Sequence, residues 1–372
     1  MILSKLSPKT RRNISRIIPF GLIWLFLGWI FLINDLSLIG NQDVNSDSAI
    51  TISVPIFIFA SLAVFLVGLI IGTMEMIVFE KRFTNYSLPS KIAAKFLIYS
   101  TILLMIILIT FPIAGSIEQG LPPFHPIVLS KMGRFLSSLV FLNTALQLSF
   151  ELFLSLIYAA ISENLGHNIL KNFFTGRYHT PKVEKRIFMF LDMKNSTAIA
   201  EKLGHVTYFQ FLRKYYESHS DSIINHLGEV YQYVGDEIVL TWELKKGVQN
   251  NHWLRCYFEL KKNLNALRSS FEKEFGVTPD FRAGVHVGEV TTGEIGALKK
   301  EIVYTGDVLN TAARLQNLCK EYSADLIFSE DINGLIYKQN ENPIKPLGKI
   351  LLQGKSNTTT IYTIENSLDS NR

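Results

Sequence analysis

The chain has 372 residues, of which 48% are hydrophobic, and its formal net charge is +5. The mean hydropathy of +0.21 is high for a soluble protein, and the apolar residues concentrate in the first half of the chain. This asymmetry predicts a membrane part followed by a water-soluble part. The modest charge argues against nucleic acid as a partner. The two cysteines, Cys256 and Cys319, have no Cys or His neighbour at metal-ligand spacing.

The first half contains apolar stretches that are long enough to cross a bilayer as helices of about 20 residues each. They cover residues 17–33, 52–78, 96–117 and 135–161. Lysine and arginine gather in the N-terminal tail and the second loop, whereas the first loop carries only acidic charges. The positive-inside rule then predicts a multi-pass protein of the inner or plasma membrane, in contact with lipid, with its N-terminus and its second half in the cytoplasm. Residues 1–161 are therefore expected to form an all-α transmembrane domain of four helices. The third loop holds Pro122, Pro123 and Pro126 and is expected to be a turn rather than a helix.

Polar residues recur inside the fourth apolar stretch. Asn143, Gln147 and Glu151 have the spacing i, i+4, i+8, which places them on one face of a helix. The favoured explanation is interhelical hydrogen bonding within a bundle or a dimer. The alternative is that Glu151 titrates, or binds a ligand that biases the signalling state.

Residues 162–182 join the two halves. Leu165, Ile169, Leu170 and Phe173 share one face of a predicted helix, which Gly176 and a following proline then end. We interpret this segment as a helical transducer that leads into the second domain, residues 183–372.

The second domain alternates predicted strands and helices. Strands are expected at residues 185–192, on both sides of a turn at Gly235-Asp236, and at 281–290, 301–304, 325–329 and, as a last hairpin, 349–363. Helices are expected from Ser196, which can cap the first, to about His226, at 250–275 and at 308–322. This order matches an α+β ferredoxin-like core with additions at its C-terminal end.

Two carboxylates stand where this fold would bring strand ends together. Asp192 ends the first strand and Asp236 lies at the hairpin tip. Such a pair can hold two divalent cations, Mg²⁺ or Mn²⁺, for nucleotidyl transfer. Backbone amides of the turn at residues 193–197 suit a triphosphate, and Asn310 and Arg314, at i and i+4, can stabilise charge on a phosphoryl group. Each feature alone is typical of a turn, a cap or a surface residue, so the prediction depends on their joint occurrence.

Five motifs in this half resemble those of the class III adenylyl/guanylyl cyclases, over roughly residues 185–364. They are FLDMKNST (residues 190–197), VGD (234–236), RAGVHVGEV (282–290), YTGDVLNTAARL (304–315) and LQGKS (352–356). Their order is that of the family. Leu309 stands where the family usually has valine.

The resemblance implies a homodimer with shared active sites. Asp192, Met193 and Asp236 of one chain would be the metal site, facing Asn310 and Arg314 of the other. Substrate contacts are implied for Asn195, Ser196, Thr197 and Lys355 on the phosphate side. The ribose 3′-hydroxyl of ATP would attack the α-phosphorus, giving 3′,5′-cyclic AMP and pyrophosphate.

The purine is less clearly specified than the chemistry. Adenylyl cyclases of this family usually have Lys and Asp where this chain has Gln232 and Val303, and guanylyl cyclases have Glu at the first of these places. A glutamine amide both donates and accepts, so it can read adenine or guanine. We expect ATP, because Glu is absent and because Gln occurs as a variant in bacterial adenylyl cyclases. The alternatives are a guanylyl cyclase and a membrane receptor with a degenerate, inactive cyclase fold. A diguanylate cyclase is disfavoured because VGDEI lacks the first glycine of GGDEF.

Overall fold

The computed structural model describes residues 6–39, 48–79, 82–83, 86–165, 170, 172, 175–336, 343–351 and 358–364, with residues 35–39 as backbone only. The chain divides into two compact units. One is Thr10–Lys171, and the other is Asn172–Arg372 together with Met1–Lys9.

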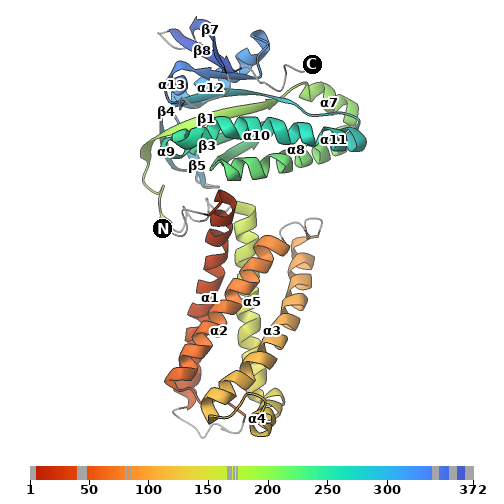
Figure 1. Ribbon diagram of the computed structural model, residues 1–372, viewed down its shortest axis with the longest axis vertical. Coiled ribbons are helices and arrows are strands. Elements are labelled where there is room, and N and C mark those ends of the chain that lie inside the picture. The colour runs from red at the N-terminus through yellow and green to blue at the C-terminus, as the bar shows by residue number, and fades with distance from the viewer. Residues whose placement is uncertain are drawn as a thin grey trace. The chain divides into compact units, whose positions relative to one another are not determined.

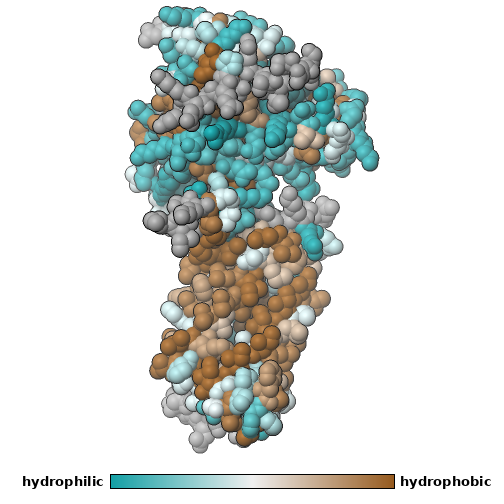
Figure 2. Space-filling model, in the orientation of Figure 1, coloured by the Kyte–Doolittle hydropathy of each residue, from teal (hydrophilic) through white to brown (hydrophobic). Residues whose placement is uncertain are grey.

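The first unit is built from helices (Figure 1). They are α1 (Pro8–Ile39), α2 (Val54–Thr73) continued by the π-helix η2 (Met74–Val78), α3 (Leu88–Gln119), α4 (Pro126–Leu136) and α5 (Leu139–Leu165). Within the described residues, four helices are long and apolar enough to cross a membrane, judged by length and composition alone. They are Pro8–Asn34, Val54–Val78, Leu88–Gln119 and Leu139–Asn164. Figure 2 shows hydrophobic residues covering the visible face of these helices.

The third loop contains a helix, so the prediction of a turn there is wrong. α4 begins at Pro126, in the first helical turn, where the missing N–H of proline leaves no hydrogen bond unmade. His125 precedes it as N-cap and accepts a hydrogen bond from the backbone N–H of Ile127 at 3.4 Å. α4 ends at Leu136 and α5 begins at Leu139, so Phe135 belongs to α4. The sequence had predicted Phe135 at the start of the fourth long helix.

Ionisable side chains lie inside this helical unit. Glu75, in η2, forms an ion pair with Lys95 of α3, and it also accepts a hydrogen bond from the Tyr99 hydroxyl at 2.8 Å. All three side chains are buried. A buried charge without a partner is costly, so this pairing explains how α2 and α3 tolerate both charges.

The polar positions of α5 have different environments. Asn143 is exposed in the isolated unit, Gln147 is half-buried and Glu151 is only 1% exposed. The Glu151 Oε2 atom has no hydrogen-bond partner among the described residues. One turn further along α5, Ser155 Oγ accepts an interhelical hydrogen bond from Trp24 Nε1 of α1 at 2.7 Å.

The second unit is a mixed α+β domain around one sheet (Figure 1). Its strands are β1 (Lys182–Met193), β2 (Glu229–Val234), β3 (Glu237–Glu243), β4 (Phe281–Ile295), β5 (Glu301–Thr305), β6 (Leu326–Ser329), β7 (Ile344–Leu351) and β8 (Thr358–Ile364). Its α-helices are α7 (Ser196–Leu203), α8 (His205–Asn225), α9 (Leu244–Val248), α10 (His252–Ala266), α11 (Arg268–Phe275), α12 (Asp307–Glu321) and α13 (Glu330–Asn333).

The strand order confirms the predicted ferredoxin-like core. The sheet runs β2-β3-β1-β4, continues through β6, β8 and β7, and has β5 paired to β4 off this path. β1 is antiparallel to both β3 and β4, whereas β4 and β6 are parallel. The predicted helix at 250–275 is interrupted, because α10 ends at Ala266 and α11 starts at Arg268.

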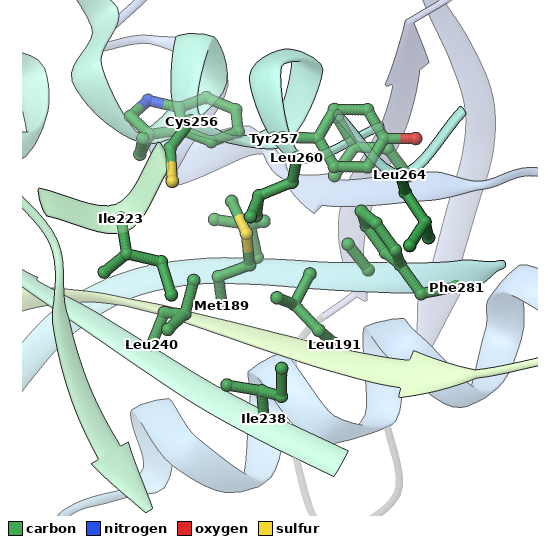
Figure 3. Packing of buried hydrophobic residues seen from close by; sticks show 14 of the residues in the cluster. Met189, Leu191, Ile223, Ile238, Leu240, Cys256, Tyr257, Leu260, Leu264 and Phe281 are labelled. Atoms are coloured by element: carbon green, nitrogen blue, oxygen red, sulfur yellow. The ribbon is translucent and has the colours of Figure 1, made fainter. Parts of the chain in front are cut away.

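The alternation of β1 separates two cores. Met189 and Leu191 point to the face covered by α8 and α10, where they pack with Leu240 and Leu260 (Figure 3). Phe188, Phe190 and Asp192, at the intervening positions, lie on the other face. The apolar residues of that second core include Val308 and Ala312 of α12. Asp192 therefore lies on the α12 side of the sheet.

Candidate functional site

Asp192 and Asp236 come together at one end of the sheet. Leu191 pairs with Ile238 across β1 and β3, so the β2–β3 turn lies beside the end of β1. The two carboxyl groups are close enough for the charge of Asp236 to raise the pKa of Asp192. One structural reason is the tight turn itself, where Gly235 has a φ of 63°, which favours glycine.

The electrostatics of the pair favour a cation. Burial raises the pKa of Asp192, and the charge of Asp236 raises that pKa further, against opposing effects of Gln316 and Arg282. Burial, followed by the charges of Asp192 and Asp236, raises the pKa of the adjacent Glu237 to about 7. Asp236 Oδ2 is buried and has no hydrogen-bond partner among the described residues. A buried carboxylate oxygen without a hydrogen-bond partner is a suitable ligand for a hard divalent cation.

The described residues do not form a complete metal cage. No group of three or more His, Cys, Asp or Glu side chains in that part of the chain is arranged to hold a metal ion. Further ligands would have to be backbone, water or substrate oxygens. Met193 follows Asp192, but its side chain is buried in the main core, so it can offer only its backbone.

Tyr216 of α8 holds the hairpin tip. The Tyr216 hydroxyl donates a hydrogen bond to the Gly235 carbonyl, and its ring lies 4.4 Å from that of Tyr233. Burial, and then the charge of Asp236, raises the pKa of Tyr216 to about 12. The hydroxyl therefore stays protonated at neutral pH and remains a donor. Sequence patterns gave no signal for this contact, because Tyr216 is 19 residues from Gly235.

The turn after Asp192 is fixed by a network that the sequence did not reveal. Lys194 forms ion pairs with Asp280 at 2.6 Å and with Asp325 at 2.5 Å, so its ammonium group is already paired. Asn195 occupies the N-cap position of α7 with a φ of 58°, and its side chain makes no capping hydrogen bond. Ser196 is the first helical residue, so its expected role as the cap is wrong.

The residues expected to meet the phosphates have different accessibilities. Asn195 and Thr197 are exposed, and Ser196 is half-buried. Lys355 lies outside the described residues.

α12 packs tightly on the sheet because β4 carries glycines beneath it. A Cβ atom on Gly284 would lie 2.1 Å from the backbone nitrogen of Gln316, and one on Gly288 would lie 2.6 Å from a methyl of Val308. This close approach places the Gln316 side chain beside Asp192, where its amide lowers the pKa of that carboxyl group. Gln316 was missed at the sequence level, since a helical glutamine six residues after Asn310 carries no signal of its own.

Asn310 and Arg314 do not meet the carboxylate pair within one chain. Asn310 is exposed and Arg314 is half-buried, whereas the helix buries Ala312 and Gln316 against the sheet. Among the described residues, neither Asn310 nor Arg314 forms a hydrogen bond or an ion pair with Asp192.

Gln232 and Val303 occupy separate strands. Gln232 is exposed on β2, beside an irregularity in its pairing with β3 between Val230 and Gln232. Val303 is half-buried on β5 and pairs with Gly293 of β4.

A family model described as "Adenylate and Guanylate cyclase catalytic domain" matches residues 179–366, just over half of the chain. Adenylate cyclase 2 of Rhizobium meliloti (strain 1021) is 34% identical over 172 residues, covering 46% of this chain and 47% of that protein. Adenylate cyclase 1 of the same organism is 29% identical over 184 residues, covering 47% and 27%. The match thus spans less than half the length of these curated relatives.

Solved structures with a similar fold include the adenylyl cyclase CyaB from P. aeruginosa, at 21% identity and a TM-score of 0.45. That likeness covers 50% of this chain and 96% of the other. A bacterial light-regulated adenylyl cyclase has 19% identity and a TM-score of 0.49, covering 62% and 64%. The family model covers Asp192, Asp236, α12 and all the strands from β1 to β8. On that match, this chain belongs to the family of adenylate and guanylate cyclase catalytic domains.

Proposed function

We propose that this chain is a membrane-bound adenylyl cyclase that converts ATP into 3′,5′-cyclic AMP and pyrophosphate. The observation that carries the proposal is the pair of Asp192 and Asp236, whose carboxyl groups meet while Asp236 Oδ2 has no partner among the described residues. Family membership supports the reaction class. The curated relatives named above as adenylate cyclases support ATP as the substrate.

In this proposal, Asp192, Asp236 and the backbone carbonyl of Met193 hold two Mg²⁺ or Mn²⁺ ions per site. Bound there, the ions would supply positive charge that stabilises the attacking and leaving oxygens. The ribose 3′-hydroxyl attacks the α-phosphorus, the bond to pyrophosphate breaks, and the hydroxyl proton passes to solvent. Asn195, Ser196 and Thr197, which follow Asp192 directly, and Lys355 orient the polyphosphate.

Asn310 and Arg314 act in the second half of the site. Because they have no bond to Asp192 within their own chain, we propose that they serve the carboxylate pair of a second copy. The active form is then a homodimer with two shared sites, as symmetric association predicts. Arg314 stabilises charge developing on the phosphoryl oxygens, and Asn310 orients the ribose.

The purine is read by Gln232 and Val303 of the chain that supplies Arg314. Gln232 is exposed, so its amide is free to turn toward adenine or guanine. We favour ATP, and GTP is the second candidate because the same amide can serve guanine.

We also propose that the four long helices span the inner or plasma membrane, in contact with lipid, with the N-terminus and the catalytic domain in the cytoplasm. Residues 1–161 then form the membrane domain, 162–182 the transducer and 183–372 the catalytic domain. Glu151 is the candidate for an input inside the membrane domain, since it is buried and its Oε2 has no partner among the described residues. If Glu151→Gln leaves activity unchanged across pH and lipid composition, that role is refuted.

The test uses the full-length chain in membranes, with ATP or GTP and with Mg²⁺ or Mn²⁺. We expect cyclic AMP as the main product and a loss of at least about 100-fold in Asp236→Asn, because the cation site loses a charge. Faster turnover of GTP would overturn the choice of purine, and no cyclic nucleotide at all would overturn the function.

Complementation tests the shared site. Asp236→Asn and Arg314→Ala copies should each be inactive, but co-expression should restore about a quarter of wild-type activity, because half of the dimers then carry one intact site. If the mixture stays as inactive as each variant alone, each site is made by one chain.

A further inference from the structure

Arg186 is a charged residue in the interior of the catalytic domain. It lies in β1 and is only 1% exposed. Its Nε donates to Thr241 Oγ1 at 3.0 Å, its Nη1 to Glu184 Oε1 at 3.2 Å and its Nη2 to Glu229 Oε2 at 2.6 Å. The guanidinium carbon also lies 4.8 Å from the centre of the Tyr304 ring. These groups, Arg186, Glu184, Glu229, Thr241 and Tyr304, form what we call the Arg186 cluster.

Stability alone does not explain this cluster. A buried ion pair is often no more stabilising than well-packed apolar side chains of similar volume. The neighbouring inward positions on β1, Phe188 and Phe190, are indeed apolar. What Arg186 adds is fixed geometry, since its planar fork bonds β1 to β2 and β3 and stacks on β5 at the same time.

The Arg186 cluster reaches the chain neighbours of both purine-reading positions. Tyr304, stacked on Arg186, follows Val303 directly. Tyr304 packs edge to face against Tyr231, with ring centres 4.9 Å apart and an interplanar angle of 78°. Tyr231 precedes Gln232 and lies at the irregularity of β2. The chain neighbours of Gln232 and Val303 thus contact each other through two rings, of which the Tyr304 ring lies against Arg186.

The segment that enters the catalytic domain joins the same cluster. Glu184 accepts hydrogen bonds from Thr292 at 2.7 Å and from Tyr178 at 3.3 Å. The Tyr178 carbonyl accepts the backbone N–H of Glu294 at 3.1 Å. Gly293, which pairs with Val303, lies between Thr292 and Glu294 on β4. Tyr178 of the entry segment therefore contacts β4 at Glu294, and its partner Glu184 of β1 contacts β4 at Thr292. These two contacts lie on either side of Gly293.

We propose that Arg186 is a positioning residue for purine recognition, which holds β2 and β5 at the spacing that lets Gln232 and Val303 meet one base. Through Glu184 and Tyr178, the same cluster ties that spacing to the segment arriving from the transducer. The inference rests on the proposed nucleotidyl cyclase function and deepens it, because it assigns the rigidity of the base pocket to a residue that contacts no substrate.

The experiment uses the full-length chain with Arg186→Lys, which keeps the charge but loses the fork. We expect the KM for ATP to rise about tenfold and the ATP-to-GTP ratio of kcat/KM to fall toward one, with kcat changing less than twofold. Mn²⁺ binding without nucleotide should match that of the wild type, because the carboxylate pair is untouched. Glu229→Gln, a milder change to the same cluster, should shift KM and the purine ratio in the same direction.

Lys214→Met is the matched control. Lys214 of α8 pairs with Glu274 of α11 at 2.5 Å and lies 4.9 Å from the Phe271 ring centre, so its loss removes an ion pair and a ring contact at a more exposed position. It should lower thermal stability without changing the KM for ATP or the purine ratio. If both cluster variants lower only stability or only kcat, as a purely structural role predicts, the positioning role is refuted.

The wild-type chain separates this inference from the proposed function. If the wild type forms no cyclic nucleotide, the function fails, and equilibrium binding of a fluorescent ATP analogue decides the role of Arg186 instead. Weaker binding in both cluster variants, with unchanged binding in Lys214→Met, supports positioning. Equal binding in all four proteins, or no binding to the wild type, overturns it.

Discussion

Replacing Gly284 by alanine should push α12 away from the sheet. The added methyl carbon would lie 2.1 Å from the Gln316 nitrogen and 2.3 Å from the Ala312 carbonyl oxygen. Both are backbone atoms of one helix, so no side-chain rotation can relieve the contact. Ordinary van der Waals contact begins at 3.4 Å, so the distance between the added carbon and the Gln316 nitrogen must increase by 1.3 Å.

An overpacked core typically loses about 1–3 kcal/mol, and a clash with backbone belongs at the upper end of that range. A loss of about 3 kcal/mol in a domain of this size lowers Tm by roughly 6–12 °C. The displacement should also move Gln316 away from Asp192, whose pKa it lowers. We therefore expect faster hydrogen exchange in α12 and a fall in cyclase activity, in addition to the lower Tm.

Thermal unfolding and hydrogen–deuterium exchange of α12 peptides measure these effects. Gly334→Ala is the control, because the nearest atom to its added carbon would be 3.7 Å away and its φ is −62°. It should change stability by less than about 0.5 kcal/mol. If Gly284→Ala unfolds within 2 °C of the wild type while α12 keeps its protection, the close packing of α12 on β4 is refuted.

Other predictions concern buried polar groups. Burial lowers the pKa of His219 from 6.5 to about 4. The unfolded chain therefore binds a proton at this histidine at a higher pH than the folded chain does. The resulting contribution to the free energy of unfolding, roughly 2–4 kcal/mol, is fully present above pH 6.5 and is lost as the pH falls toward 4. His219→Gln should flatten that part of the stability curve, and an unchanged slope between pH 7 and pH 4 would contradict the assignment. Lys95→Met leaves Glu75 buried without its cation and should cost about 3–5 kcal/mol, read as the Tm of the solubilised chain. Adding Glu75→Gln should recover most of that loss, and no recovery would argue against the pair. Ser155→Ala removes the acceptor of Trp24 Nε1 and should cost about 1–3 kcal/mol in the same assay, whereas an unchanged Tm would mean that this bond contributes nothing.

The architecture of the catalytic domain could be predicted because its signals are local. An apolar run that ends in Asp192 and a Gly235-Asp236 turn between alternating segments are patterns of single strands and hairpins. The order of these elements predicts the strand order of the sheet. That strand order places the β2–β3 turn beside the end of β1 and so brings Asp236 close to Asp192. The same logic could not find Gln316, Tyr216 or the partners of Lys194, since each contact joins residues that are far apart in sequence.

The error at α4 has a specific cause. Three prolines in one loop were interpreted as helix breakers, although Pro126 stands at a helix start, where its ring is compatible with helical φ. Arg186 was missed for a related reason. A charged residue near the start of a strand is usually exposed, and only the shared parity with Phe188 and Phe190 indicated that it points inward.

The position of Gln316 beside Asp192 has a consequence for how two active sites would behave in the proposed dimer. Gln316 of α12 lies beside Asp192 of its own chain. Asn310, about 120° around the same helix, would face the carboxylate pair of the neighbouring chain. About 1.7 turns of helix separate these two residues along α12. Charge neutralisation at one Asp192 would change the force on Gln316 and hence the position of Asn310 in the other site. Nucleotide titrations should then give a Hill coefficient different from one, and Gln316→Leu should return it toward one.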